Sequence, residues 1–317
     1  MQAIRITAND LEFEVLVAGS SDRLLLMLHG FPDDARSFIP MMQRLSEAGF
    51  CCAAPFMRGY RPSEVPEPVR RCSLATTQIA DLATDVAKLS QALKARLGCK
   101  SVYLAGHDWG AITVQAAINR NPELYRKAVM MSVPPGRVFL GNLLRNPGQL
   151  ARSWYILFFQ LPWLPESRLR SSKSRFIARL WRAWSGDMTR FQQRIDEVTA
   201  TLSEPVNARA AMAYYRGLLR PSPADCGRWL LSRKLFLGAL KGPVLVLSGE
   251  RDRCITPAMF RHCDRAVAPF GGRYRMIEGA GHFLPLEAPD PVIEETLRFF
   301  RESDEESPTG SKPGRMQ

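Results

Sequence analysis

Asp108 stands in a segment whose residue spacing suggests nucleophilic chemistry. The stretch LAGHDWGAIT, residues 104–113, places it between an apolar run and a segment of helical composition. Glycines two residues before and two residues after it would let the backbone turn sharply from a strand into a helix. Such a turn exposes its central side chain above the sheet, and it usually carries serine. A second interpretation is a simple helix cap, because aspartate is a preferred N-cap residue, and the motif alone does not decide.

A nucleophile of this kind needs a base and an acid that orients the base, and later segments supply both. Asp252 directly follows the apolar run VLVLSG, and His282 follows YRMI beside two glycines. The order nucleophile, acid, histidine is one of the known chain orders of a catalytic triad built at the ends of strands. Glu250 competes with Asp252 for the role of the acid. A lone histidine is usually structural, but the position of His282 after a strand favours a catalytic role.

The turn His29-Gly30-Phe31-Pro32 predicts the site of negative-charge stabilisation. It follows the apolar run LLLML, residues 24–28. In this arrangement the loop supplies one backbone N–H group and the residue after the nucleophile supplies another. We therefore expect the N–H groups of Phe31 and Trp109 to form an oxyanion hole.

The elements that must position these residues follow an alternating pattern. Short, continuous apolar runs are typical of strands covered on both faces, as in a parallel sheet. Between them, Thr76–Leu97 has a helical period and ends at Gly98, and Asp290–Arg301 begins with an aspartate that could cap a helix. The pattern predicts an α/β fold with a mostly parallel, doubly wound sheet. The apolar runs are 24–28, 50–55, 102–105, 128–132, 244–248 and 274–277.

One long segment interrupts the alternation and predicts a second domain. Residues 136–234 contain no convincing buried strand and are rich in arginine and aromatic residues. We expect a helical lid, or cap, inserted into a core domain made of residues 1–135 and 235–302. A cleft between two such domains is a common place for a ligand. Residues 303–317 are polar and contain proline and glycine, which predicts a disordered tail.

Five motifs together resemble those of the α/β-hydrolase fold, in its epoxide hydrolase family of the soluble, bacterial type. They are HGFP (29–32), MRGY (57–60), GHDWG (106–110), GERD (249–252) and GAGHF (279–283). The resemblance covers nearly the whole chain except the tail. It implies an enzyme that converts an epoxide to a vicinal diol through an ester on Asp108, which water activated by His282 then hydrolyses. Haloalkane and fluoroacetate dehalogenases also carry aspartate at this turn, so the carboxylate alone does not separate these enzymes.

The resemblance also points to two tyrosines in the inserted segment. Opening an epoxide places charge on the ring oxygen, and in this family two lid tyrosines donate hydrogen bonds to it. Tyr155 stands four residues before FQLP (159–162), like the first lid tyrosine, and Tyr215 in AYYRG matches the second. Tyr214 is the weaker candidate for that second position. Each tyrosine alone could equally be an ordinary packing residue.

Two alternatives to an epoxide hydrolase stay open. The first is a haloalkane dehalogenase, and the second is a non-catalytic binding protein of the same fold. The intact set of Asp108, Asp252 and His282 argues against the binding protein, which has no need of all three. The epoxide reaction requires a small-molecule epoxide and water, and neither a metal nor an organic cofactor.

The charge and the cysteines give weaker expectations about partners and location. The formal net charge is +12, but no nucleic-acid motif accompanies it, so no nucleic-acid partner is expected. The arginine-rich lid could steer an anionic lipid epoxide or contact a membrane surface, although long arginines covering helix faces are the simpler explanation. Seven unpatterned cysteines and the absence of a recognisable signal peptide favour a cytoplasmic protein with reduced thiols. A homo-oligomer stays open as a further expectation.

Overall fold

The computed structural model describes residues 1–72, 74–171, 175–186, 188–221 and 226–302. In this part of the chain, eight strands form one sheet in the order β1-β2-β4-β3-β5-β6-β7-β8. Strand β1 pairs antiparallel with β2, β2 pairs antiparallel with β4, and all other neighbours are parallel. The predicted tail, residues 303–317, lies outside the described residues. The strands are β1 (Gln2–Ala8), β2 (Leu11–Ala18), β3 (Arg23–Leu28), β4 (Cys51–Pro55), β5 (Ser101–His107), β6 (Ala128–Met131), β7 (Val244–Gly249) and β8 (Arg273–Ile277).

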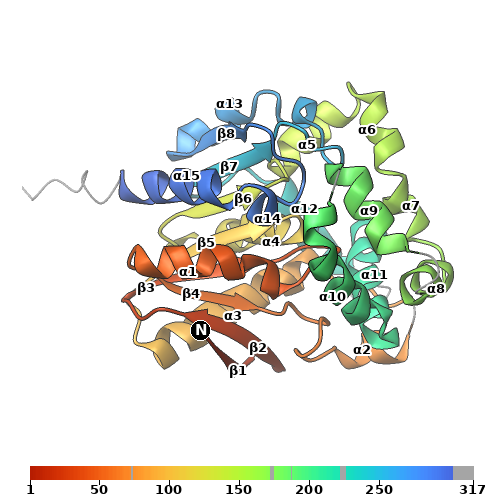
Figure 1. The fold of residues 1–317 in the computed structure, drawn as a ribbon, viewed down its shortest axis with the longest axis horizontal. Coiled ribbons are helices and arrows are strands. Elements are labelled where there is room, and N and C mark those ends of the chain that lie inside the picture. The colour runs from red at the N-terminus through yellow and green to blue at the C-terminus, as the bar shows by residue number, and fades with distance from the viewer. Residues whose placement is uncertain (73, 172–174, 187, 222–225, 303–317) are drawn as a thin grey trace, which may run out of the picture.

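Five of the six apolar runs of the sequence become inner strands because both faces of the sheet are covered there. The sixth, 274–277, becomes β8 at the edge of the sheet, where most side chains are exposed, so the prediction that it is covered on both faces is wrong. In β3, Leu24, Leu26 and Leu28 enter one hydrophobic cluster, and Leu25 and Met27 enter the other. Helices α3 (Ile79–Leu97) and α4 (Trp109–Arg120) pack on the first face, and α1 (Ile39–Glu47) and α15 (Pro289–Arg301) on the second. Figure 1 shows α1 and α15 in front of the sheet, with α3 and α4 behind it. The prediction of a mostly parallel sheet between two helical layers is confirmed.

The sequence predicted where one helix ends and where another begins, and only the first prediction is confirmed. Helix α3 ends as expected, since Gly98 follows it with a φ of 70°, which glycine adopts without a steric penalty. The prediction that Asp290 caps the last helix is wrong. Helix α15 begins at Pro289, so Asp290 already lies in its first turn and its side chain instead pairs with Arg44.

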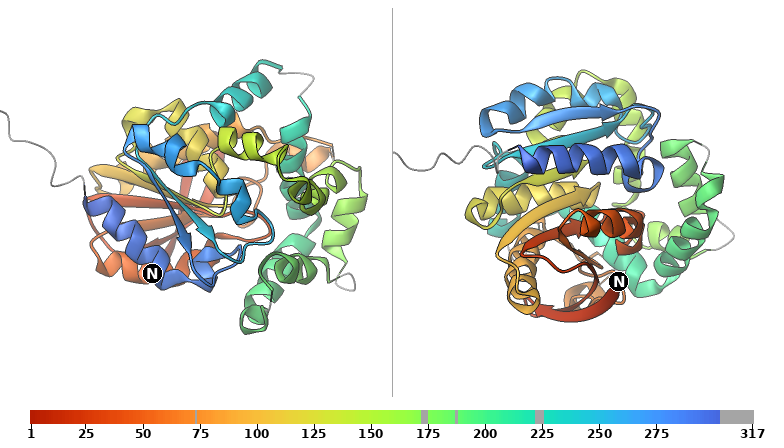
Figure 2. Two further views of the ribbon diagram at one scale, coloured as in Figure 1. Left: turned by 90° about the horizontal axis from the view of Figure 1, so that it is seen from above. Right: turned by 60° about the vertical axis from the view of Figure 1, so that its left-hand side comes forward.

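A helical segment separates β6 from β7 and covers one end of the sheet. It contains α5 to α12, and no strand is found in the described residues between Gly136 and Leu237. Figures 1 and 2 show α6 to α11 gathered at this end of the molecule. Helix α12 crosses the predicted domain boundary at residue 234 and packs on α3 and α4 of the core. The helices of this segment are α5 (Gly136–Leu143), α6 (Pro147–Arg152), α7 (Trp154–Phe158), α8 (Leu164–Arg170), α9 (Phe176–Ser185), α10 (Gln192–Ser203), α11 (Pro205–Leu219) and α12 (Cys226–Leu237).

Three short helices complete the core and connect its last strands. Helix α2 (Glu67–Arg71) precedes α3, α13 (Cys263–Val267) lies between β7 and β8, and α14 (Leu284–Glu287) leads into α15. Strands β3, β5, β6, β7 and β8 pair parallel to their neighbours, so their carboxyl ends lie at the same end of the sheet. The topology therefore places the four predicted catalytic loops at one end of the strands, below the inserted helices.

Candidate active site

Asp108 occupies the turn between β5 and α4 with a backbone φ of 52°, which is unusual for a residue with a side chain. The turn is possible because Gly106 and Gly110 lie against neighbouring backbone. A Cβ added at Gly110 would lie 1.9 Å from the carbonyl oxygen of Leu28. Asp108 stands at the N-cap position of α4, but its side chain makes no capping hydrogen bond to the helix. Its carboxylate is directed elsewhere.

One oxygen of the Asp108 carboxylate is held by the loop after β3. The backbone N–H of Phe31 donates to Asp108 Oδ1 over 2.8 Å. Gly30 permits this approach, since a Cβ there would lie 2.5 Å from the same oxygen. Trp109 is the first residue of α4, where the N–H group has no partner within the helix. The two predicted N–H donors thus come from the two loops that meet at Asp108.

The other oxygen faces the predicted base. Asp108 Oδ2 lies 3.8 Å from Nε2 of His282, which has no hydrogen-bond partner among the described residues. On its other side, Nδ1 of His282 lies 2.9 Å from Oδ2 of Asp252. The backbone N–H groups of Cys254 and Ile255 donate to the second oxygen of Asp252 and fix its carboxylate. The structure brings Asp108, His282 and Asp252 into one chain of contacts.

Glu250, the competing candidate for the acid, lies elsewhere. Its carboxylate is exposed and accepts the backbone N–H of Gly279. Asp252 is buried beside the imidazole. Of the two acids, the geometry therefore supports Asp252 as the partner of His282.

The electrostatics of His282 follow from its two carboxylate neighbours. Burial on its own lowers the pKa of a histidine, because it disfavours the charged imidazolium. The negative charges of Asp252 and Asp108 outweigh burial and raise the pKa of His282 to about 10. In the resting protein His282 is therefore an imidazolium between two carboxylates. Loss of the charge on Asp108 would remove part of this support and lower the pKa of His282.

Both predicted lid tyrosines lie above the nucleophile. The ring of Tyr215 contacts the rings of Phe31 and Trp109, with centroids 5.4 and 5.3 Å away. Tyr155 lies beside it, with ring centroids 5.9 Å apart, and contacts Trp184, which itself packs on His282. Burial, followed by the negative charge of nearby groups that include Asp108, raises the pKa of both phenols well above its usual value. Both therefore stay protonated and able to donate a hydrogen bond.

Tyr214, the weaker candidate, points away from the nucleophile. Its hydroxyl donates to the carbonyl oxygen of Arg58 over 2.9 Å, and its ring packs on Tyr60 and Trp109. Its phenol is thus already engaged with the core. The geometry supports Tyr215 over Tyr214 as the tyrosine that meets a substrate.

The other histidines have structural surroundings. His29 donates from Nδ1 to the carbonyl of Gly30 and accepts the N–H of Met57 at Nε2, so it joins the HGFP and MRGY segments. His107 donates from Nε2 to the carbonyl of His282. Burial, and next the positive charge of His282, lower the pKa of His107 to about 4, which keeps it neutral. His262 is exposed, just before α13.

Sequence reasoning missed three residues that hold the loop of His282. Ser132, at the end of β6, donates its hydroxyl to the carbonyl oxygen of His282. Ser185, the last residue of α9, accepts the backbone N–H of His282 and donates to Glu287. The Glu287 carboxylate also accepts the N–H groups of Gly281 and Phe283. The backbone of Ser132, with a φ of 64° after a strand, is a structural sign of this role, but no pattern in the sequence marks Ser185 or Glu287.

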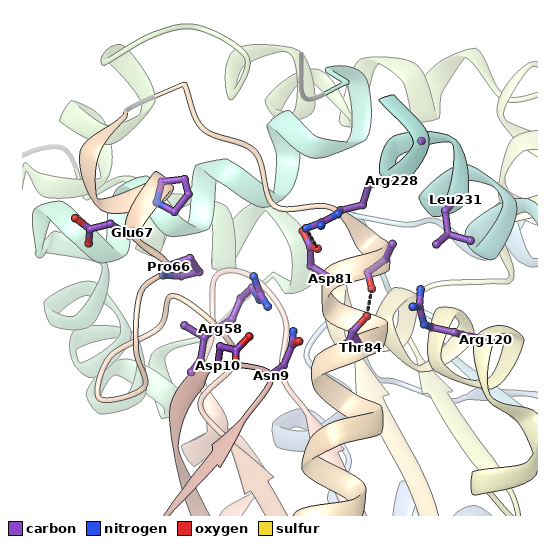
Figure 3. Close-up of a pocket in the computed structure, with 14 residues that line it drawn as sticks. Asn9, Asp10, Arg58, Pro66, Glu67, Asp81, Thr84, Arg120, Arg228 and Leu231 are labelled. Carbon is purple, nitrogen blue, oxygen red and sulfur yellow. Dashed lines mark hydrogen bonds and ion pairs between the residues drawn. The ribbon is translucent and has the colours of Figure 1, made fainter. Parts of the chain in front are cut away.

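A separate polar pocket of about 740 Å³ lies outside this site. Its lining residues come from the β1–β2 turn and from segments that include α2, α3 and α12, and none of them belongs to the predicted catalytic set. Figure 3 shows Arg228 and Asp81 directed toward each other across it, with a distance of 2.8 Å. Arg58, which also lines it, is paired with Asp85. Its charges thus largely satisfy one another, and it contains none of the groups that the predicted reaction needs.

Comparison with known proteins agrees with this architecture. A family model described as the alpha/beta hydrolase fold matches residues 23–289. Epoxide hydrolase 3 of mouse is 26% identical, over 88% of this chain and 71% of the relative, and epoxide hydrolase A of Mycobacterium tuberculosis is 26% identical, over 93% and 96%. A crystal structure of the Bacillus megaterium epoxide hydrolase with an inhibitor matches with a TM-score of 0.75 at 24% identity, over 94% of this chain and 100% of that one.

Proposed function

This chain belongs to the alpha/beta hydrolase fold family, and from that premise we propose that it is an epoxide hydrolase that forms a vicinal diol. One observation carries the proposal. The carboxylate of Asp108 has one oxygen on a backbone N–H and the other toward His282, and the buried rings of Tyr215 and Tyr155 pack beside the turn that carries it. Similarity to relatives named epoxide hydrolase supports the same conclusion.

In the first step, Asp108 Oδ2 attacks one carbon of the epoxide. The carbon–oxygen bond of the ring breaks, and Tyr155 and Tyr215 donate hydrogen bonds to the leaving oxygen and supply its proton. The product is a hydroxyalkyl ester of Asp108. Oδ1 becomes the carbonyl oxygen of this ester and stays on the N–H of Phe31. A serine at this turn would suit acyl transfer, whereas a carboxylate can be alkylated by carbon and regenerated by hydrolysis.

In the second step, His282 becomes the base. Esterification removes the negative charge of Asp108, which lowers the pKa of His282 and releases its proton. The released proton replaces, on the tyrosines, the one that they gave to the ring oxygen. Neutral His282, oriented by Asp252, then takes a proton from water, which attacks the carbonyl carbon of the ester. The Phe31 and Trp109 N–H groups stabilise the oxyanion, the ester bond breaks, and the diol leaves with the proton from His282. The second proton of the water, left on the Asp108 carboxyl, passes to His282 and restores the carboxylate and the imidazolium.

The proposal assigns the inserted helices to a lid and the sheet with its flanking helices to a catalytic core. Residues 136–234 provide both tyrosines, and the loops of the core provide Asp108, Asp252, His282 and Phe31. Helix α12 is the exception, since it lies within the lid segment by sequence and packs on the core. The substrate epoxide would be enclosed between the two parts.

A trapping experiment tests the proposal. Styrene-type, aliphatic and fatty-acid epoxides are each mixed with the wild type and with His282→Gln. The reaction is quenched, and the mass of the protein is measured by mass spectrometry. We expect diol from the wild type, and from His282→Gln an adduct on Asp108 with the mass of the epoxide. The Asp108→Asn variant should give neither product.

Two results would replace the proposal with one of its alternatives. Release of chloride or bromide from haloalkanes, with no turnover of any epoxide, would identify a haloalkane dehalogenase. The absence of both adduct and product with every substrate would favour a binding protein of the same fold.

A further inference from the structure

The inserted helices expose an unusual number of large apolar side chains. Leu144 is 83% exposed, Trp163 is 70% exposed and Leu157 is 68% exposed. Singly exposed apolar residues are common, but a concentrated group marks an interaction surface. These residues lie on α5 to α8 and their connections, which follow one another along one side of the molecule (Figure 1). The group consists of Leu140, Leu144, Leu150, Trp154, Leu157, Leu161, Trp163 and Leu164, here called the lid face.

The lid face carries positive charge and no exposed acid. Five arginines lie on the same helices and connections, and all are exposed. The only acidic residue between positions 136 and 171 is Glu166. It is buried and pairs with Arg216 over 2.7 Å, so it contributes nothing to the surface. The five arginines are Arg137, Arg145, Arg152, Arg168 and Arg170.

An apolar pocket opens on this face. Its volume is about 360 Å³, and Leu140, Leu150 and Leu157 line it together with residues of α11 and α12. Trp229 also lines it, and the indole N–H of this residue is buried without a hydrogen-bond partner in the described part of the chain. Arg233 lies at the pocket with its guanidinium 4.9 Å from the Trp229 ring. The pocket thus combines room for an aliphatic chain with a cation beside it.

We propose that the lid face docks on the surface of a bilayer that contains anionic phospholipids. Leucine and tryptophan side chains would enter the boundary between headgroups and acyl chains, and the arginines would bind the phosphates. An acyl chain could occupy the apolar pocket. No described helix has the length and apolar character needed to cross a bilayer, so the contact is one of surface attachment. This inference is independent of the proposed catalytic activity.

A second copy of this chain fits the face less well. In a symmetric dimer the same patch would meet itself, so the five arginines of each copy would face those of the other without an exposed acid to pair with. An anionic bilayer offers the complementary charge. The charge pattern therefore favours lipid over self-association.

Vesicle flotation tests the proposal with the full chain. Vesicles of phosphatidylcholine alone are compared with vesicles that contain phosphatidylglycerol, at low and at high salt. We expect flotation only with the anionic vesicles, falling at least tenfold at high salt, and a blue shift of tryptophan fluorescence on binding. The shift should be largely lost in a Trp154→Phe, Trp163→Phe double variant.

Matched variants distinguish binding through the lid face from nonspecific adsorption to vesicles. Leu144→Glu with Leu157→Glu should abolish flotation, whereas Met276→Glu, at an exposed apolar residue of β8, should leave it unchanged. Arg145→Glu with Arg152→Glu should weaken it at least tenfold, and Arg126→Glu, at an exposed arginine before β6, should not. Thermal unfolding checks that each variant is folded.

The proposal is overturned by any of three results. The first is equal flotation of the Leu144→Glu, Leu157→Glu variant and the wild type. The second is no flotation of the wild type at all. The third is a wild-type dimer in sedimentation that dissociates in this variant, which would show that a second copy covers the face.

Discussion

The two oxygens of Asp108 have different surroundings, and in the proposed reaction they have different roles. Oδ1 already lies on the N–H of Phe31, where charge would develop during ester hydrolysis. Oδ2 lies 3.8 Å from Nε2 of His282, beyond hydrogen-bond distance. The more weakly held oxygen is the one free to attack carbon. The carboxylate is therefore oriented before any substrate arrives, and little reorganisation is needed in either step.

The lid tyrosines should act on epoxide opening alone. Tyr155→Phe and Tyr215→Phe each remove a donor to the ring oxygen, and the loss of one such donor costs roughly 10²-fold or more in rate. We expect this loss in the rate of adduct formation, measured by quenched flow, with the rate of ester hydrolysis little changed. Tyr214→Phe is the matched control, because its hydroxyl is bound to Arg58. Equal losses in Tyr214→Phe and Tyr215→Phe would contradict the assignment.

The charge of Asp108 should be visible in the titration of His282. Asp108 is one of the groups that raise the pKa of His282 to about 10. The Asp108→Asn variant removes that charge, so the pKa of His282 should fall, as it would when the ester forms. Nitrogen-15 NMR of the imidazole across the pH range measures both values. An unchanged pKa in Asp108→Asn would remove the basis for the proposed release of the proton.

The same imidazole makes stability depend on pH. A group whose pKa is higher in the folded chain stabilises the fold below its unfolded pKa, and this contribution is lost as the pH rises through the folded pKa. The ordinary pKa of histidine is 6.5, and the folded pKa of His282 is about 10. The difference in unfolding free energy between wild type and His282→Gln should therefore shrink between these two pH values. Urea unfolding at several pH values measures it, and a difference that grows with pH would contradict the charged resting state.

At the scale of elements, the turn between β5 and α4 depends on close backbone contact. Gly110→Ala would place a methyl group 1.9 Å from the Leu28 carbonyl oxygen, which belongs to the strand beside β5. Backbone cannot move aside cheaply, so we expect a loss of about 3 kcal/mol in unfolding free energy and loss of activity. Gly141→Ala in α5 is the control, because nothing lies within 4 Å of its added Cβ. It should be neutral or should stabilise the protein by up to about 1 kcal/mol, as measured by urea unfolding.

The sequence was informative where a local pattern dictates the element. Continuous apolar runs predicted the inner strands, and paired glycines predicted the turn at Asp108. The first two strands were missed because they pair antiparallel at the edge of the sheet. In β1 only Ile6 and Ala8 are buried and their neighbours are exposed, so no continuous apolar run marks it. The pattern of continuous apolar residues that identified β3 to β7 does not apply to such strands.

The contacts around His282 could not be predicted, for a different reason. Ser185 lies almost 100 residues before His282, and it meets the histidine and Glu287 only because α9 ends above their loop. A single serine or glutamate has no local pattern that reveals a partner so far away in the sequence. Asp108, Asp252 and His282 had such a pattern, since each follows a strand.

At the scale of the whole molecule, buried basic residues hold the inserted helices to the core and to one another. Arg194 of α10 lies 2.9 Å from Asp33 and 2.5 Å from Asp34, both in the loop after the HGFP turn. Arg216 of α11 pairs with Glu166 of α8 and is fully buried. These arginines are structural, whereas those of the lid face remain exposed. The basic residues behind the net charge of +12 therefore fall into a buried, paired group and an exposed group, which the sequence alone did not separate.

The contact of Arg194 with the two aspartates should be a main link between lid and core. Burial disfavours the charged form of Asp33 and raises its pKa, and the charge of Arg194, 2.9 Å away, opposes this effect. Arg194→Ala leaves both carboxylates without this partner, and breaking a buried ion pair from one side costs about 3–5 kcal/mol. We expect a lower midpoint of urea unfolding and faster proteolysis of the lid segment. Arg179→Ala, at an exposed arginine of α9, should change the unfolding free energy by less than about 0.5 kcal/mol. If the two variants unfold alike, the lid is held by its apolar contacts, and the ion pairs of Arg194 contribute little to its attachment.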